Sequence, residues 1–106
     1  MAKVLIKVDV RRPASLLEAL QAQHEQRRAH GELTFSFCID DNKRNIGYVI
    51  LEWKSLRSLD RFLESPAAKR MIDQWPIIDT LEILELRNVA TIMKEIDAEW
   101  RQLGSD

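Results

Sequence analysis

The side chains that could carry acid–base or nucleophilic chemistry near neutral pH are two histidines and one cysteine. His24 continues an apolar stripe of a predicted helix toward the expected pocket, where it could orient a phenolate or act as a base. The alternative is a half-buried histidine hydrogen-bonded at the helix end. Gly31 is placed to end this helix as a left-handed cap. His30 adjoins it at the helix terminus, where a cation suits the helix dipole, so His30 is expected to cap the helix.

Cys38 has no histidine close to it in sequence that could activate its thiol, so a nucleophilic role is not expected. A single cysteine also excludes an internal disulfide and fits a reducing compartment. Two histidines and one cysteine at unrelated spacings lack the pattern of a metal site. The sequence therefore predicts no metal and no cofactor, and it leaves the catalytic residues unknown.

Apolar and aromatic side chains could instead line a pocket for a small molecule. The candidate pocket residues are His24, Phe35, Tyr48, Phe62 and Ile72. Side chains of these types also fill protein cores, so a packed core is the competing interpretation. Lys69 and Arg70 are expected to lie on a solvated helix face.

The elements that must position these residues can be predicted from periodicity and from turn and capping residues. Alternating apolar residues predict strands, and three- and four-residue spacing predicts helices. The predicted elements are a strand over residues 3–10, a helix from Pro13 to about Ala29, strands over residues 33–39 and 46–53, a helix from Ser55 that restarts at Ser65 and Pro66, and a strand over residues 77–86.

This order, β-α-β-β-α-β, is that of a ferredoxin-like α+β fold. The right-handed crossover rule places the first and third strands in the centre of a four-stranded antiparallel sheet, with both helices on one face. Leu33, Phe35, Phe37 and Ile39 are expected to share one side of the second strand. The other face of the sheet, with Leu5, Lys7, Thr34, Ser36 and Cys38, is mixed in character. We expect a second copy to cover it, because the third strand is apolar on both sides.

Residues 89–106 are not needed by the four-stranded unit, which occupies residues 1–88. Apolar side chains at helical spacing predict a C-terminal amphipathic helix: Val89, Ile92, Met93, Ile96, Trp100 and Leu103. Its polar face mixes acidic and basic residues, unlike the basic face of a membrane-surface helix. We expect this helix to pack on protein, on its own sheet edge, on the second subunit or in a larger oligomer.

Overall composition excludes several partners. The chain has 106 residues and a formal net charge of −1. It therefore has no net positive charge that would attract nucleic acid or anionic lipid. Residues 44–51 match part of an RNA-stacking motif, but Ile46 and Leu51 stand where stacking aromatics are required. No apolar run reaches the length of a membrane span. We therefore predict a cytoplasmic protein that binds neither nucleic acid nor membrane.

Several short motifs resemble the antibiotic biosynthesis monooxygenase-like family of dimeric α+β barrels. They are E-W-K-S at 52–55, F-L-E-S-P at 62–66, K-R-M at 69–71 and H-G-E-L-T-F at 30–35. The resemblance covers about residues 3–87. It implies a homodimer whose two sheets pack face to face, with a pocket between each sheet and its own helices. Some members oxidise aromatic polyketides without a cofactor, and others degrade haem.

The haem-degrading branch has an asparagine on the first strand and a tryptophan and an axial histidine on the second helical region. The matching positions here fall near Val8 and on Phe62 and Ile72, all of them apolar. Haem degradation is therefore not expected, because no imidazole is available to ligate iron at that place.

Two functions remain open. The first is a homodimer that binds a small apolar or aromatic molecule, with cofactor-independent oxygenation as the implied reaction. In that reaction a substrate-derived carbanion would react with O₂, and His24 or Tyr48 would handle protons. The second is a non-catalytic assembly or partner-binding protein with a packed core and an oligomerising C-terminal helix.

Overall fold

The computed structural model describes residues 2–87, which form four strands and four helices. The predicted helix over residues 89–103 lies outside those residues. The elements are β1 (Ala2–Asp9), α1 (Pro13–Ala22), α2 (His24–His30), β2 (Glu32–Ile39), β3 (Ile46–Trp53), α3 (Leu56–Glu64), α4 (Pro66–Asp73) and β4 (Asp79–Arg87). Within residues 2–87, no helix combines the length and apolarity needed to cross a membrane.

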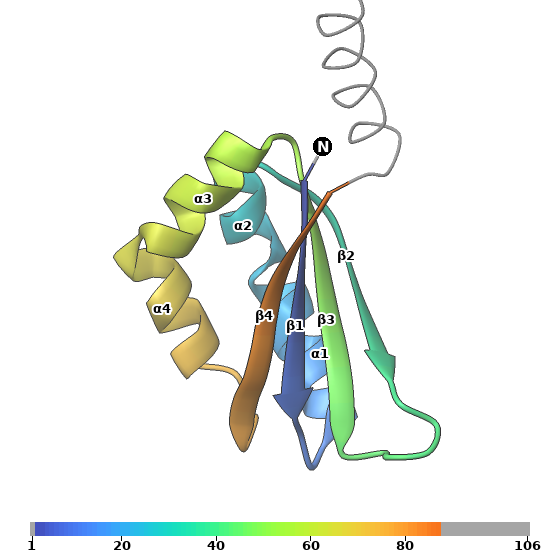
Figure 1. Ribbon diagram of the computed structural model, residues 1–106. Helices are drawn as coiled ribbons and strands as arrows, with labels where there is room; N and C mark the ends of the chain where they lie inside the picture. The colour runs from blue at the N-terminus through green and yellow to red at the C-terminus, as the bar shows by residue number, and fades with distance from the viewer. Residues whose placement is uncertain (1, 88–106) are drawn as a thin grey trace, which may run out of the picture.

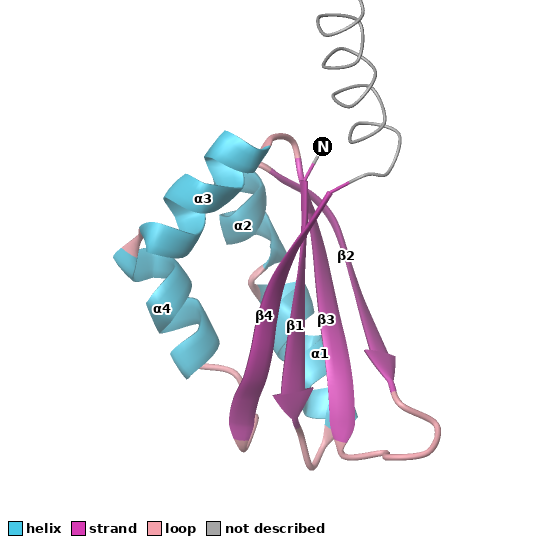
Figure 2. Cartoon of the chain, in the orientation of Figure 1, coloured by secondary structure: helices cyan, strands magenta, loops and turns pink. Residues whose placement is uncertain are grey.

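The strands form one antiparallel sheet in the order β2-β3-β1-β4, with β1 and β3 in the centre. Figure 1 shows that all four helices lie on one side of this sheet, and Figure 2 shows the same two layers by secondary structure. The predicted α+β fold with its ferredoxin-like strand order is therefore confirmed. The α1–α2 pair and the α3–α4 pair are the two helical arms that cover the sheet.

The strand register separates the two faces of the sheet. Val4 pairs with Leu51 and Ile6 with Val49, and all four side chains are fully buried beneath the helices. The intervening pairs, such as Leu5 with Ile50, point to the other side. We call that side the open face; it carries Lys3, Leu5, Lys7, Thr34, Ser36, Cys38, Tyr48, Ile50, Glu52, Leu84 and Leu86. The five residues predicted for the mixed face are among them.

The α1–α2 arm differs from the prediction of one helix to about Ala29, because it bends at Gln23. The Gln23 side-chain oxygen accepts a hydrogen bond from the Trp75 indole at 2.8 Å, and its nitrogen donates to the Met71 carbonyl at 3.3 Å. The backbone bond from Arg27 N–H to the Gln23 carbonyl continues across the bend. These contacts to Met71 of α4 and to Trp75, just after it, therefore join the two arms at this bend.

Gly31 ends α2, as predicted, and its backbone has a φ of 122°. Only glycine adopts such a conformation without strain. A Cβ atom at this position would also lie 2.8 Å from the Trp53 indole nitrogen. That nitrogen donates to the His30 carbonyl at 3.2 Å, so the corner between α2 and β2 closes tightly on Trp53.

The first residues of β2 contain an irregularity that the alternating pattern did not reveal. The register with β3 shifts between Glu32 and Thr34, and Leu33 is 46% exposed. The prediction that Leu33 shares a face with Phe35 is therefore wrong. Because a bulge reverses the alternation at this point, Glu32 points into the interior, where it is 3% exposed.

The α3–α4 arm is broken where the sequence predicts it. The Ser55 hydroxyl accepts from the Ser58 N–H at 3.1 Å and the Ser65 hydroxyl from the Ala68 N–H at 3.3 Å, so both serines cap helices. Pro66 occupies the first turn of α4. The change of direction at this corner sets how α4 lies over β4.

Candidate functional site: an apolar cleft between α4 and β4

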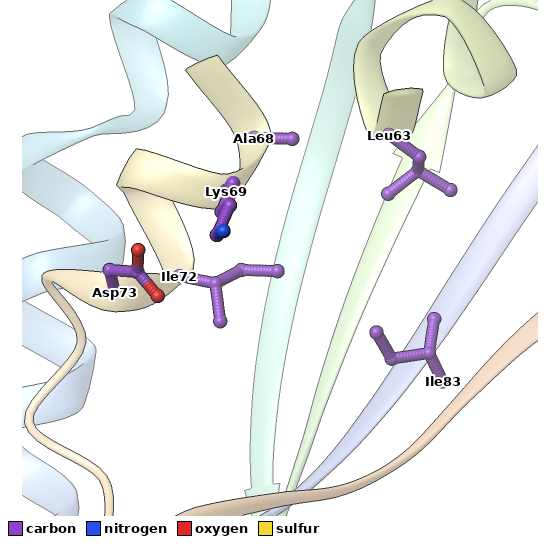
Figure 3. Close-up of a pocket in the computed structure, with 6 residues that line it drawn as sticks. All are labelled: Leu63, Ala68, Lys69, Ile72, Asp73 and Ile83. Carbon is purple, nitrogen blue, oxygen red and sulfur yellow. The ribbon is translucent and has the colours of Figure 1, made fainter. Parts of the chain in front are cut away.

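A cleft of about 310 Å³ lies between the α3–α4 arm and the edge strand β4. Figure 3 shows the side chains of Leu63, Ile72 and Ile83 pointing into this space from α3, α4 and β4. Ala68, Lys69 and Asp73 complete the lining. Four of the six lining residues are apolar, and the two charged ones both come from α4.

The cleft forms because only some of the apolar side chains of α4 pack against the core. Ala68 and Met71 are buried against the core at 2% and 4% exposure, whereas Ile72 is only partly buried. On the opposite wall, Ile83 points to the helix side of the sheet but remains 47% exposed. The cleft therefore has apolar walls on two sides and an open mouth.

The size and lining of the cleft suit a small, largely apolar molecule. Ligand sites in proteins usually measure about 300–1,000 Å³ and combine an apolar lining with a few polar groups. Lys69 could pair with an anionic group such as a phenolate or carboxylate, and Asp73 could accept a hydrogen bond. Among residues 2–87, no group of three or more His, Cys, Asp or Glu side chains could hold a metal ion.

An acidic pair, Glu85 and Asp60, joins β4 to α3 without lining the cleft. Burial raises the pKa of the Glu85 carboxyl on β4, and the hydrogen bond and negative charge of Asp60 on α3 raise it further. Glu85 lies two residues after Ile83 on the same side of β4. This pair therefore holds a proton at higher pH than an isolated glutamate would.

A network of charged side chains lies at the opposite edge of the sheet, beside β2. The Arg27 Nε donates to one oxygen of Glu32 at 2.5 Å, and the His24 Nδ1 lies 2.6 Å from the other oxygen. The Arg27 Nη2 also donates to the Leu20 carbonyl at 2.9 Å. The side chains of Arg27 and Glu32 are both fully buried, whereas that of His24 is 28% exposed. This network ties α1 and α2 to the first residues of β2.

Phe35 packs beside this network. Its ring centroid lies 5.0 Å from that of His24 and 5.0 Å from the guanidinium carbon of Arg27. Within the described residues, no buried side-chain nitrogen or oxygen lacks a hydrogen-bond partner. The network is therefore fully satisfied, as expected of a structural element.

The five predicted pocket residues lie in four separate places. Ile72 lines the cleft. Phe62 is 2% exposed and stacks on Trp53, with 4.9 Å between the ring centroids, so it belongs to the core. His24 and Phe35 lie together over β2, outside the cleft. Tyr48 lies on the open face, where it pairs with Lys7 and Cys38.

Sequence reasoning missed the other lining residues of the cleft. The sequence predicts Lys69 on a solvated helix face; the residue is exposed, and it also lines the cleft. Ile83 is an apolar residue on the helix side of an edge strand, which is the one sequence signal that could have pointed to this wall. Arg27 and Glu32 were missed because the bulge that turns Glu32 inward leaves no signal in the sequence.

The four-stranded antiparallel sheet with two helical arms on one face defines a ferredoxin-like α+β protein. Among solved structures with this architecture, a provisionally named antibiotic biosynthesis monooxygenase from Bordetella bronchiseptica matches with a TM-score of 0.67 and 12% identity, over 82% of this chain and 95% of its own. A provisionally named one from Deinococcus radiodurans matches with a TM-score of 0.62 and 17% identity, over 83% and 92%.

A third structure, of an antibiotic biosynthesis monooxygenase, matches with a TM-score of 0.59 and 16% identity, over 83% of this chain and 98% of its own. The chain therefore has the fold of the antibiotic biosynthesis monooxygenase-like proteins, as the sequence motifs predicted. No protein-family profile and no curated protein matches the sequence.

Proposed function

We propose that this protein binds a small, largely apolar or aromatic molecule in the cleft between α4 and β4. The observation that carries the proposal is the convergence of Leu63, Ile72 and Ile83 on a space of about 310 Å³. A core residue normally contacts neighbours on all sides, whereas these three face a gap large enough for a ligand. Lys69 would favour a molecule with an acidic group.

Cofactor-independent oxygenation is the reaction that the similar structures favour, since several carry the name monooxygenase. In such a reaction a base removes a proton from an activated methylene carbon, and the carbanion reduces O₂. One oxygen atom replaces the two hydrogens of that carbon, and the other leaves as water. In the cleft, Lys69 would stabilise the anion and Asp73 would accept the proton.

Substituting Ile72 with tryptophan should weaken ligand binding at least about tenfold, because the indole would fill the cleft. Anilinonaphthalene sulfonate (ANS), an apolar aromatic anion, is a suitable probe, with its fluorescence titrated against the folded protein. The control is Leu17→Trp, on an α1 residue that is 39% exposed and lies outside the cleft. Equal ANS affinity of both variants and the unsubstituted protein would contradict the proposed site.

We also propose that the protein is a homodimer that pairs through its open face. Leu84 of β4, Leu5 of β1 and Ile50 of β3 form one row across three strands. Leu84 and Leu86 are 41% and 37% exposed, so this row presents an apolar surface of the kind that marks an interface. Beside the row, Lys3 and Glu52 form an ion pair at 3.0 Å, and this contact lowers the pKa of the Glu52 carboxyl.

Replacing Ile50 with aspartate should convert the dimer to a monomer, because the new charge would be buried at the centre of the interface. Light scattering coupled to size-exclusion chromatography measures the mass directly. Leu17→Asp, on the helical side of the molecule, should leave the mass unchanged. A dimer that survives Ile50→Asp at the same concentration would show that the open face is not the interface.

A non-catalytic assembly role is the second candidate, and the burial of Phe62 favours it. The interior around Phe62 and Trp53 is packed, and Phe35 is engaged by Arg27 and His24. A ligand would therefore bind in the cleft at β4 and not in the interior around Phe62. Absence of ANS binding to a folded dimer would favour the assembly role over the ligand-binding one.

A further inference from the structure

A second cavity lies between the loop that leads from β1 into α1 and the loop that leads from α4 into β4. Figure 1 shows both loops at the same end of the sheet. The cavity measures about 350 Å³ and shares no lining residue with the cleft. Its lining comes from two segments and consists of Arg11, Arg12, Ser15, Pro76, Ile77 and Ile78. Cationic side chains and a short apolar segment therefore border one space.

The sheet holds the two lining segments in place. The Ile78 N–H donates to the Asp9 carbonyl at 2.7 Å, which ties the segment before β4 to the end of β1. Val10, next to Arg11, is fully buried, and its N–H donates to the Asn45 carbonyl at 2.7 Å. A ligand would therefore meet a backbone that is already ordered, which lowers the entropy cost of binding.

The two arginines carry charge that no carboxylate of residues 2–87 neutralises. The ion pairs within those residues involve Lys3, His24 and Arg27 instead. Arg11 and Arg12 are both exposed, so their guanidinium groups can reach a ligand. A guanidinium presents a planar fork of N–H donors that matches the oxygens of a carboxylate or a phosphate. The lining therefore favours an anion.

The apolar part of the lining favours an organic anion over an inorganic one. Ile77 packs against the core, whereas Ile78 is 55% exposed. An aliphatic or aromatic group laid over Ile78 would remove apolar surface from water. Inorganic phosphate would leave that surface exposed. A volume of about 350 Å³ also falls in the usual range for small-molecule sites.

We propose that this cavity is a second ligand site, which binds a small organic phosphate monoester. The phosphate would lie on Arg11 and Arg12, and the apolar part on Ile77 and Ile78. A phosphate monoester carries a charge of about −1.5 to −2 at pH 7, which matches two guanidinium groups better than a carboxylate does. The half-buried Ser15 hydroxyl can donate to a phosphate oxygen. This site does not rest on ligand binding in the cleft.

Calorimetric titration of the full chain with phenyl phosphate tests the site. Phenyl phosphate should bind at least about tenfold more tightly than either inorganic phosphate or phenol. The double variant Arg11→Gln, Arg12→Gln should weaken phenyl phosphate at least about tenfold. The matched control, Arg57→Gln with Arg61→Gln, removes two exposed arginines of α3 outside the cavity and should keep the affinity. No binding, or equal affinity of the two double variants, would overturn the proposal.

Two further results locate the apolar part of the ligand. Ile78→Ser, at an exposed position, should weaken phenyl phosphate but leave inorganic phosphate unchanged. In isoleucine-methyl magnetic resonance spectra, phenyl phosphate should shift the signals of Ile77 and Ile78 and leave those of Ile72 and Ile83 in place. Shifts confined to Ile72 and Ile83 would put the ligand in the cleft and overturn the second site.

Discussion

Replacing Arg27 with methionine should lower the free energy of unfolding by about 3–5 kcal/mol, the usual loss when one partner of a buried ion pair is removed. The side chains of Arg27 and Glu32 are both fully buried. Methionine keeps most of the aliphatic volume but leaves the Glu32 carboxylate with His24 as its remaining partner. Urea unfolding measures the change.

The neighbouring Arg28 provides the matched control, because it is exposed on the same helix. Arg28→Met should change the free energy of unfolding by less than about 0.5 kcal/mol. Adding Glu32→Gln to Arg27→Met should recover part of the lost unfolding free energy, because no unpaired carboxylate then remains buried. A change below about 1 kcal/mol for Arg27→Met would mean that the pair is more hydrated than its burial indicates.

Replacing Phe62 with alanine should cost about 3–5 kcal/mol of unfolding free energy. The Phe62 ring lies between Trp53 and His30, with centroid distances of 4.9 and 5.1 Å. A cavity at that position would remove contacts on both sides of the ring and could not be refilled without moving the α2–β2 corner. Urea unfolding followed by circular dichroism gives the change.

The same substitution separates the two interpretations of Phe62. A core residue contributes stability, so Phe35→Ala, at a partly buried position, should cost less than Phe62→Ala. A pocket residue would contribute to ligand binding instead. The Phe62→Ala protein could instead stay within about 1 kcal/mol of the original stability and lose ANS binding. That result would contradict the assignment of Phe62 to the core and show that it belongs to the ligand site.

The element order could be predicted from the sequence because the local signals are strong and agree with one another. The serine caps at Ser55 and Ser65 and the glycine at Gly31 each have a local physical cause, and each is found where the sequence places it. The right-handed crossover rule then fixes the strand order. These features depend on residues close in sequence.

The failures have non-local causes. Residues 46–53 are apolar on both sides, so alternation alone could not tell which side faces the helices, and Tyr48 turned out to lie on the open face. The bulge after Glu32 lies in the pairing with β3, and the break at Gln23 coincides with contacts to Met71 of α4 and to Trp75 beyond it. The cleft depends on how α4 lies relative to β4, which no local pattern encodes.

Nuclear magnetic resonance of isoleucine methyl groups tests the ligand site most directly. The protein, labelled at its isoleucine methyls, would be titrated with ANS. We expect the Ile72 and Ile83 methyl signals, on opposite walls of the cleft, to shift together with one saturating affinity. The signals of Ile39 and Ile50, outside the cleft, should stay in place. Shifts confined to Ile50, or no shift at Ile72 and Ile83 at saturating ANS, would contradict the proposal that this cleft binds a small apolar molecule.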